Sequence, residues 1–156
     1  MGITEAIAME HVTLLRVFDQ VERILPQLKS AAEVCAMAMV LEGLLGTHAQ
    51  MEVDLAFAAL DPAPHNKRGL AALHEEHREV DDRFRRVGQA ATCEGARRLL
   101  RAAMCASREH FRHEERDLFP VVERALGLGV LTALGGAFKR ASKAKTKGAR
   151  SARFRL

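Results

Sequence analysis

The chain contains an internal repeat that places histidines and glutamates at matching positions in its two halves. In each half a Glu-His pair is followed by a phenylalanine and a valine, seven and ten residues after the histidine: Glu10-His11, Phe18 and Val21, then Glu76-His77, Phe84 and Val87. A second phrase, His-x-x-x-Glu with a phenylalanine nine residues after the histidine, also occurs twice: His48, Glu52 and Phe57, then His110, Glu114 and Phe119. Residues four apart lie on one face of a helix. Each half therefore predicts one helix with a core-facing histidine, followed by one with a histidine and a glutamate on one face.

The composition and the residues that begin or end helices favour an all-α fold. Ala, Leu, Glu and Arg are abundant, and the only aromatic residue is Phe, in a chain of 156 residues that suits one domain. Thr4 is expected to cap the first helix, which ends near Pro26, and Ser30 with Glu33 forms a capping box for the second. The Pro-rich stretch 61–64 breaks the chain. The expected helices span residues 4–26, 30–60, 67–87, with Gly88 as its stop, and 93–125, ending at Gly127. Short connections predict an up-down-up-down antiparallel four-helix bundle.

The C-terminal segment differs from the rest. Residues 130–139 predict a short amphipathic helix that packs Leu131, Leu134 and Phe138 across one end of the bundle. From Lys139 onward there are eight basic residues and no acidic ones, whereas the first 138 residues hold 16 basic and 20 acidic residues. We therefore expect a bundle domain at 1–138 and a flexible basic tail at 139–156. Such a tail is either solvated without a partner or contacts nucleic acid or another anionic surface.

The repeat assembles a set of metal-ligand side chains at the bundle centre. The candidate ligands are four histidines and two glutamates: His11, His48, Glu52, His77, His110 and Glu114. Imidazole suits iron, zinc, copper and nickel, and a carboxylate can bridge two cations. Two metals, each with two histidines and both sharing Glu52 and Glu114, make a sensible dinuclear site. An oxide, hydroxide or water bridge would bring each metal to about five ligands and leave an open position.

The side chains around these candidates have simpler interpretations. The glutamates that precede a ligand histidine, Glu10, Glu76 and Glu109, are expected to face solvent, and orientation of an imidazole is the less favoured alternative. His113 is expected beside the site or exposed, and the four repeat phenylalanines are expected in the core. Two other metal motifs are excluded: zinc proteases need histidines four apart, whereas His74 and His77 are three apart, and ferritin-like bundles use Glu-x-x-His.

The ligand order resembles that of the hemerythrin-like (HHE cation-binding) domains. The order is His…His-x-x-x-Glu, twice, and the phrase His-Phe-Arg-His-Glu-Glu…Leu-Phe-Pro at 110–120 is especially similar. The resemblance covers roughly residues 5–125, and 131–140 looks like the family's closing segment. It implies a non-heme di-iron centre, two iron ions with an oxo or hydroxo bridge, in which Glu52 and Glu114 bridge the metals. It also implies dioxygen, nitric oxide or peroxide as ligands.

One departure from the family pattern bears on function. Oxygen-carrying hemerythrins have a second histidine one turn before the third-helix ligand, where this chain has Leu73. They also use a longer spacing, to Asp, on the fourth helix. The nearest candidate, His74, lies about 60° from His77 around the helix and is a candidate further ligand. Without it the two irons would be equally under-coordinated, which favours peroxide or redox chemistry over reversible storage.

Three functions are therefore expected alternatives: a di-iron protein that binds or senses oxidants, a di-iron enzyme acting on peroxide, nitric oxide or ferrous iron, and a helical scaffold with a nucleic-acid-binding tail. No apolar run approaches the roughly 20 residues that span a membrane, and no signal peptide is evident. The cysteines, Cys35, Cys93 and Cys105, are odd in number and lack paired spacing. They fit free thiols in the cytoplasm.

Overall fold

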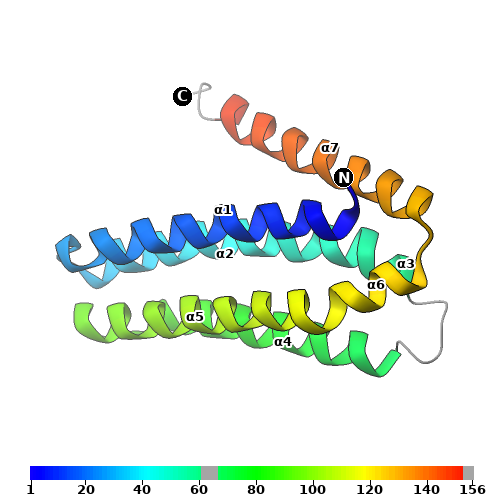
Figure 1. The fold of residues 1–156 in the computed structure, drawn as a ribbon. Coiled ribbons are helices and arrows are strands. Elements are labelled where there is room, and N and C mark those ends of the chain that lie inside the picture. Colours follow the sequence, from blue (N-terminus) through cyan, green and yellow to red (C-terminus); the bar gives the residue numbers. More distant parts are fainter. Residues whose placement is uncertain (61–66, 153–156) are drawn as a thin grey trace.

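The computed structural model describes the backbone of residues 1–60 and 67–152, and these residues form helices and no strand. The all-α prediction is therefore confirmed. The elements are α1 (Ile3–Ile24), a 3₁₀ turn (Leu25–Gln27), α2 (Ala31–Glu52), a π-helical turn (Val53–Phe57), α3 (Ala58–Leu60), α4 (Lys67–Val87), α5 (Cys93–His113), a second π-helical turn (Glu114–Leu118), α6 (Phe119–Ala125) and α7 (Leu128–Ala152). Figure 1 shows α1, α2, α4 and α5 lying side by side, with α7 beside α1.

Most helix boundaries follow the predicted signals. The Ser30 hydroxyl accepts from the Glu33 N–H at 3.2 Å, and the Glu33 carboxylate accepts from the Ser30 N–H at 3.3 Å. This reciprocal pair is the capping box. Helix α4 spans the predicted residues, Lys67–Val87, and α5 with α6 covers the predicted fourth helix. The predicted break at residues 61–64 lies outside the described residues.

The predicted cap of the first helix is wrong. The residue at the N-cap is Gly2, whose N–H donates to the Glu5 carboxylate at 2.7 Å. Thr4 lies inside the first turn of α1 and is buried. Its hydroxyl donates to Oε1 of Glu123 on α6 at 2.8 Å. Thr4 therefore links two helices.

The C-terminal helix is longer than predicted and takes another course. It continues past Lys139 to Ala152, and it turns back beside α1 instead of crossing one end of the bundle (Figure 1). Leu131, Leu134 and Phe138 do pack against the core, as expected. The division into a domain at 1–138 and a tail at 139–156 stays a prediction, and the helix runs through that boundary.

The apolar core has two parts, with a polar layer between them. One cluster gathers around Phe18 and Phe84, and the other around Phe57 and Phe138. On α1, His11 lies between Ile7 of the second cluster and Leu14 of the first, and it is fully buried. Burying polar groups between two apolar clusters is costly unless they are paired.

One stretch of the described chain, Ala31–Leu60, is long and apolar enough to cross a membrane by length and composition, with a mean hydropathy of 1.2 in its most apolar window. Core helices pass the same test. Here the stretch carries His48 and Glu52, whose side chains are buried, and it contacts α4 and α5. These contacts place the stretch within the helical bundle, with 33% of the window buried.

Candidate metal centre

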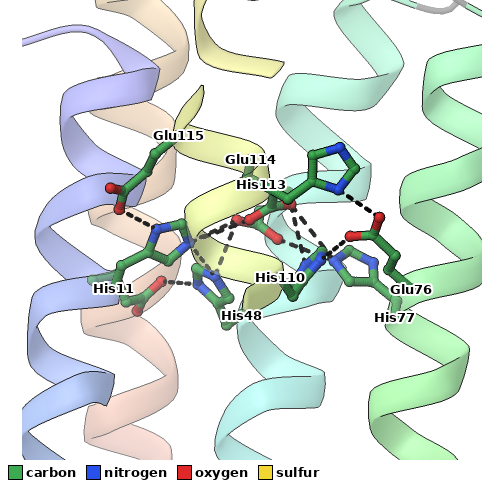
Figure 2. A network of polar contacts seen from close by, with 10 residues as sticks. His11, His48, Glu76, His77, His110, His113, Glu114 and Glu115 are labelled. Atoms are coloured by element: carbon green, nitrogen blue, oxygen red, sulfur yellow. Dashed lines mark hydrogen bonds and ion pairs between the residues drawn. The ribbon is translucent and has the colours of Figure 1, made fainter. Parts of the chain in front are cut away.

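The six predicted ligands come together in the polar layer. His11 comes from α1, His77 from α4 and His110 from α5, and Figure 2 shows these three imidazoles pointing toward the Glu114 carboxylate, with His48 beside His11. His48 and Glu52 come from α2. All six side chains are buried except that of His77, which is 13% exposed.

Glu52 directs one carboxylate oxygen toward each pair of histidines. Its Oε1 lies 3.0 Å from Nε2 of His48 and 3.5 Å from Nε2 of His11. Its Oε2 lies 3.4 Å from Nε2 of His77, on the other side. The Glu52 carboxylate thus lies between the His11 and His48 rings on one side and the His77 ring on the other, with a different oxygen facing each side.

Glu114 repeats this arrangement. Its Oε2 lies 3.4 Å from Nε2 of His11, and its Oε1 lies 3.4 Å from Nε2 of His110 and 3.8 Å from Nε2 of His77. Two groups of four side chains result, and within each the ligand atoms lie within 4.8 Å of one another. The groups are His11, His48, Glu52 and Glu114 (the first group), and Glu52, His77, His110 and Glu114 (the second group).

Six of the eight ligand atoms that face the two groups lack hydrogen-bond partners in the described structure: both carboxylate oxygens of Glu52 and of Glu114, and Nε2 of His77 and of His110. The other two, Nε2 of His11 and Nε2 of His48, lie 3.1 Å from each other. An unsatisfied buried polar group costs several kcal/mol, and native proteins rarely keep one without a reason. Across the described residues, six of the seven buried side-chain atoms without a partner are metal-ligand atoms, and these six converge; the seventh is Nε of Arg97. Imidazole nitrogen with carboxylate oxygen is a donor set that fits a transition-metal cation in each group.

Without a bound cation, protons on the histidines balance the negative charge of the two buried carboxylates. Burial opposes charge on His48, but the attraction of Glu52 and the hydrogen bond to Glu10 outweigh it and raise the pKa of His48 to about 10. Burial likewise opposes charge on His11, whose contacts with Glu114 and Glu52 raise its pKa to about 9. Burial would raise the pKa of Glu52, but His48 and His11 hold it well below its ordinary value. A metal ion must therefore displace protons from these imidazoles.

Two glutamates that were expected to face solvent instead orient ligand histidines. Nδ1 of His48 donates to Oε2 of Glu10 at 2.9 Å. Nδ1 of His110 donates to Oε2 of Glu76 at 2.9 Å (Figure 2). Each glutamate precedes one ligand in sequence and holds another on a neighbouring helix. Such a contact fixes the tautomer, so that Nε2 is free for a metal. Glu109 is exposed, as predicted.

A third glutamate, Glu115, was missed by the sequence reasoning. Its Oε1 accepts from Nδ1 of His11 at 2.8 Å. The residue at the corresponding place in the first half is Val53, which directly follows Glu52. In the described part of the chain no carboxylate contacts Nδ1 of His77. The two groups thus share a ligand set but differ in how their imidazoles are held.

Comparison with known protein families now identifies the chain. Residues 2–122 match the model of the hemerythrin HHE cation-binding domain. The chain belongs to this family. The resemblance seen in the sequence is confirmed, and the cation-binding description fits the two groups of histidines and glutamates. No curated protein and no solved structure matches the chain.

Within this hemerythrin-family site, His74 is not among the converging ligands. Its side chain is exposed, and its ring meets the ring of Phe57 edge-on, with centroids 5.2 Å apart. Leu73, at the position where oxygen carriers bear a histidine, is buried in the apolar cluster. The structure therefore brings together six of the seven candidate ligands.

His113 lies beside the hemerythrin-family site, as predicted. Its Nδ1 donates to Oε1 of Glu76 at 2.5 Å, and its Nε2 lies 3.0 Å from the Asp117 carboxylate. Glu76 therefore connects the ligand His110 to a histidine that is 36% exposed. This chain of contacts leads from the site to the surface.

The π-helical turns explain the repeated His-to-Phe spacing of nine. In each turn an N–H bonds the carbonyl five residues earlier: Ala58 to Val53, and Phe119 to Glu114. A π-helical turn holds more residues than an α-helical turn, which brings the phenylalanine five residues after each ligand glutamate closer to the face of that glutamate. The Phe57 ring lies 5.8 Å from that of His77 and nearly parallel to it. These rings exclude water beside the ligands.

Proposed function

We propose that the chain is a non-heme di-iron protein that binds or senses dioxygen, nitric oxide or a related oxidant in the core of an antiparallel four-helix bundle. The observation that carries this proposal is the division of each carboxylate between the two histidine pairs. Glu52 and Glu114 each offer one oxygen to each group. Two iron ions would then each have two imidazoles and two carboxylate oxygens, and the family description fits cations at this place.

The surroundings suit a small ligand. A cavity of about 20 Å³, room for about one water molecule, is lined by His48, His77, His110 and Ser107 among others. Iron, when bound, supplies redox chemistry and an open coordination position. The chain's own part is to hold the imidazoles through Glu10, Glu76 and Glu115, and to exclude water with apolar clusters on both sides.

Metal analysis combined with absorption spectroscopy tests the proposal. We expect two irons per chain and ultraviolet–visible bands that change on addition of azide. The matched variant is Glu52→Ala with Glu114→Ala, which should lose both irons and the bands. A folded wild-type protein that takes up no iron, or takes up only zinc, would contradict the proposal. So would a double variant with unchanged metal content.

A second candidate is an enzyme that acts on peroxide, nitric oxide or ferrous iron. The observation that favours it is the position of His74 outside the cluster, because each cation then has equal and low coordination by the protein. Rapid oxygen evolution from added peroxide by the iron-loaded protein would support the enzyme. Peroxide that persists while azide still binds would support the binding protein.

We also propose a cytoplasmic location. Cys35, Cys93 and Cys105 are free thiols, and two of them are only partly buried. Free thiols favour a reducing compartment. Fractionation of the native cells, with detection of the chain in the cytoplasm, is the corresponding measurement. Recovery in an oxidising compartment with the thiols paired would contradict it.

A further inference from the structure

Helix α7 connects the basic end of the chain to the candidate metal centre. Its Phe138 is buried and meets the His48 ring edge-on, with centroids 6.5 Å apart. One turn later the Ser142 hydroxyl donates to Oε1 of Glu10 at 3.1 Å. The other oxygen of Glu10 accepts from Nδ1 of His48 at 2.9 Å. Two contacts therefore join α7 to a single ligand histidine.

The docked position of α7 is fixed by close packing against the N-terminus. A Cβ on Gly135 would lie 2.6 Å from the Met1 carbonyl oxygen and 2.7 Å from the Gly2 carbonyl carbon. Only glycine permits this approach of two backbones. Leu131 and Leu134 pack on the same apolar cluster as Phe138. The first half of α7 is thus docked by shape as well as by apolar contact.

The second half of α7 has the charge of a phosphate-binding element. Residues 139–152 contain six Lys or Arg residues and no Asp or Glu. Of these, Lys139, Arg140 and Lys143 surround Ser142 and are exposed. The remaining residues of the stretch are Ala, Gly, Ser and Thr. A membrane-surface helix needs bulky apolar residues on one face, which this stretch lacks, so its chemistry fits the phosphate backbone of a nucleic acid.

A short helix is marginally stable in water by itself, because its first turn is costly to form. Because the first half of α7 is docked as a helix, the basic second half can extend that helix without forming a new first turn. A cation in the first group would fix the His48 imidazole and, through Glu10, the hydrogen bond to Ser142. A helix that is already ordered binds with a smaller entropy loss than one that orders on binding. Metal binding and phosphate binding would then favour the same docked state.

We propose that α7 is a nucleic-acid-binding helix whose affinity is coupled to metal occupancy of the site through Phe138, Ser142 and Glu10. The proposal rests on the proposed function in requiring a bound metal. The coupling is reciprocal: nucleic acid raises the affinity for the metal by the same factor as the metal raises the affinity for nucleic acid.

The test is fluorescence anisotropy of a labelled DNA duplex of arbitrary sequence, titrated with the full chain at low salt under anaerobic conditions, with and without Fe²⁺. We expect about fivefold tighter binding with Fe²⁺, at the lower end of typical site-to-site couplings. Ser142→Ala should bring this ratio close to one, whereas Thr132→Ala, on the exposed side of α7, should leave it unchanged. Replacing Lys139, Arg140 and Lys143 together by Gln should reduce the slope of log K against log salt by up to about 2.7.

Several results would overturn the proposal. They are the absence of duplex binding, equal affinity with and without Fe²⁺, an unchanged ratio in Ser142→Ala, and tighter binding to phosphatidylserine vesicles than to DNA. Iron content measured on the same samples separates this failure from failure of the proposed function. A chain with two irons and a ratio of one contradicts only the coupling, whereas a chain that takes up no iron contradicts both.

Discussion

Substituting Glu52 by Gln tests whether the carboxylate bridges two cations. The change keeps the shape of the side chain and removes its charge from both groups at once, because Oε1 faces His48 and Oε2 faces His77. Removing one member of a buried charge pair costs about 3–5 kcal/mol. At 1.4 kcal/mol per tenfold, each cation should therefore bind about a hundredfold to several thousandfold more weakly.

The assay is a competition titration against chelators of graded strength, with iron counted per chain. Matched controls come from the outer glutamates, each of which holds a histidine of one group only. Glu10→Gln should weaken the first group alone by about 10- to 100-fold, and Glu76→Gln the second group alone by a similar factor. A Glu52→Gln protein that still holds one cation with wild-type affinity would refute the bridging role.

The remaining predictions concern the stability of the fold. Without metal, the free energy of unfolding should fall as pH rises, because the pKa values of His11 and His48, about 9 and 10, lie above the ordinary 6.5. Their contribution is complete below pH 6.5 and is lost as pH rises through these two values, so urea midpoints that stay constant or increase between about pH 6 and pH 10 would count against it. Phe18→Ala, which empties a fully buried position, should lower the free energy of unfolding by about 3–5 kcal/mol in urea without changing the iron count at saturation. Ser30→Ala should cost about 1 kcal/mol through loss of the cap on α2, and an unchanged midpoint would contradict this.

Helix boundaries were predictable where neighbouring residues determine them. Ser30 and Glu33 satisfy each other's backbone groups within one turn, so the start of α2 is local chemistry. The prediction that Thr4 caps α1 failed because its hydroxyl donates to Glu123, 119 positions away, and no local sequence pattern reveals that contact. The end of α7 was placed too early because Phe138 is the last bulky apolar residue, whereas Ala, Lys and Arg continue a helix well without one.

The converging side chains were predictable because they share one face of each helix. The outer glutamates were not predictable from one helix alone. Glu10 lies about 100° from His11 around α1, and whether it reaches His48 depends on how α1 packs against α2. The same holds for Glu76 and His110. The repeated Glu-His pair was visible in the sequence, and its meaning depended on the packing of neighbouring helices.

The two halves of the repeat differ at one position that has a kinetic consequence: the first half has Val53 where the second half has Glu115. Because Glu115 holds the His11 ring, leaving the first group requires that hydrogen bond to break as well. The His77 ring has no such restraint in the described chain and is partly exposed, so it can turn away from its cation first. If the proposed di-iron centre forms, a chelator should therefore remove iron in two phases, with the faster loss from the second group. Val53→Glu would slow that phase and bring the two halves closer to equal behaviour.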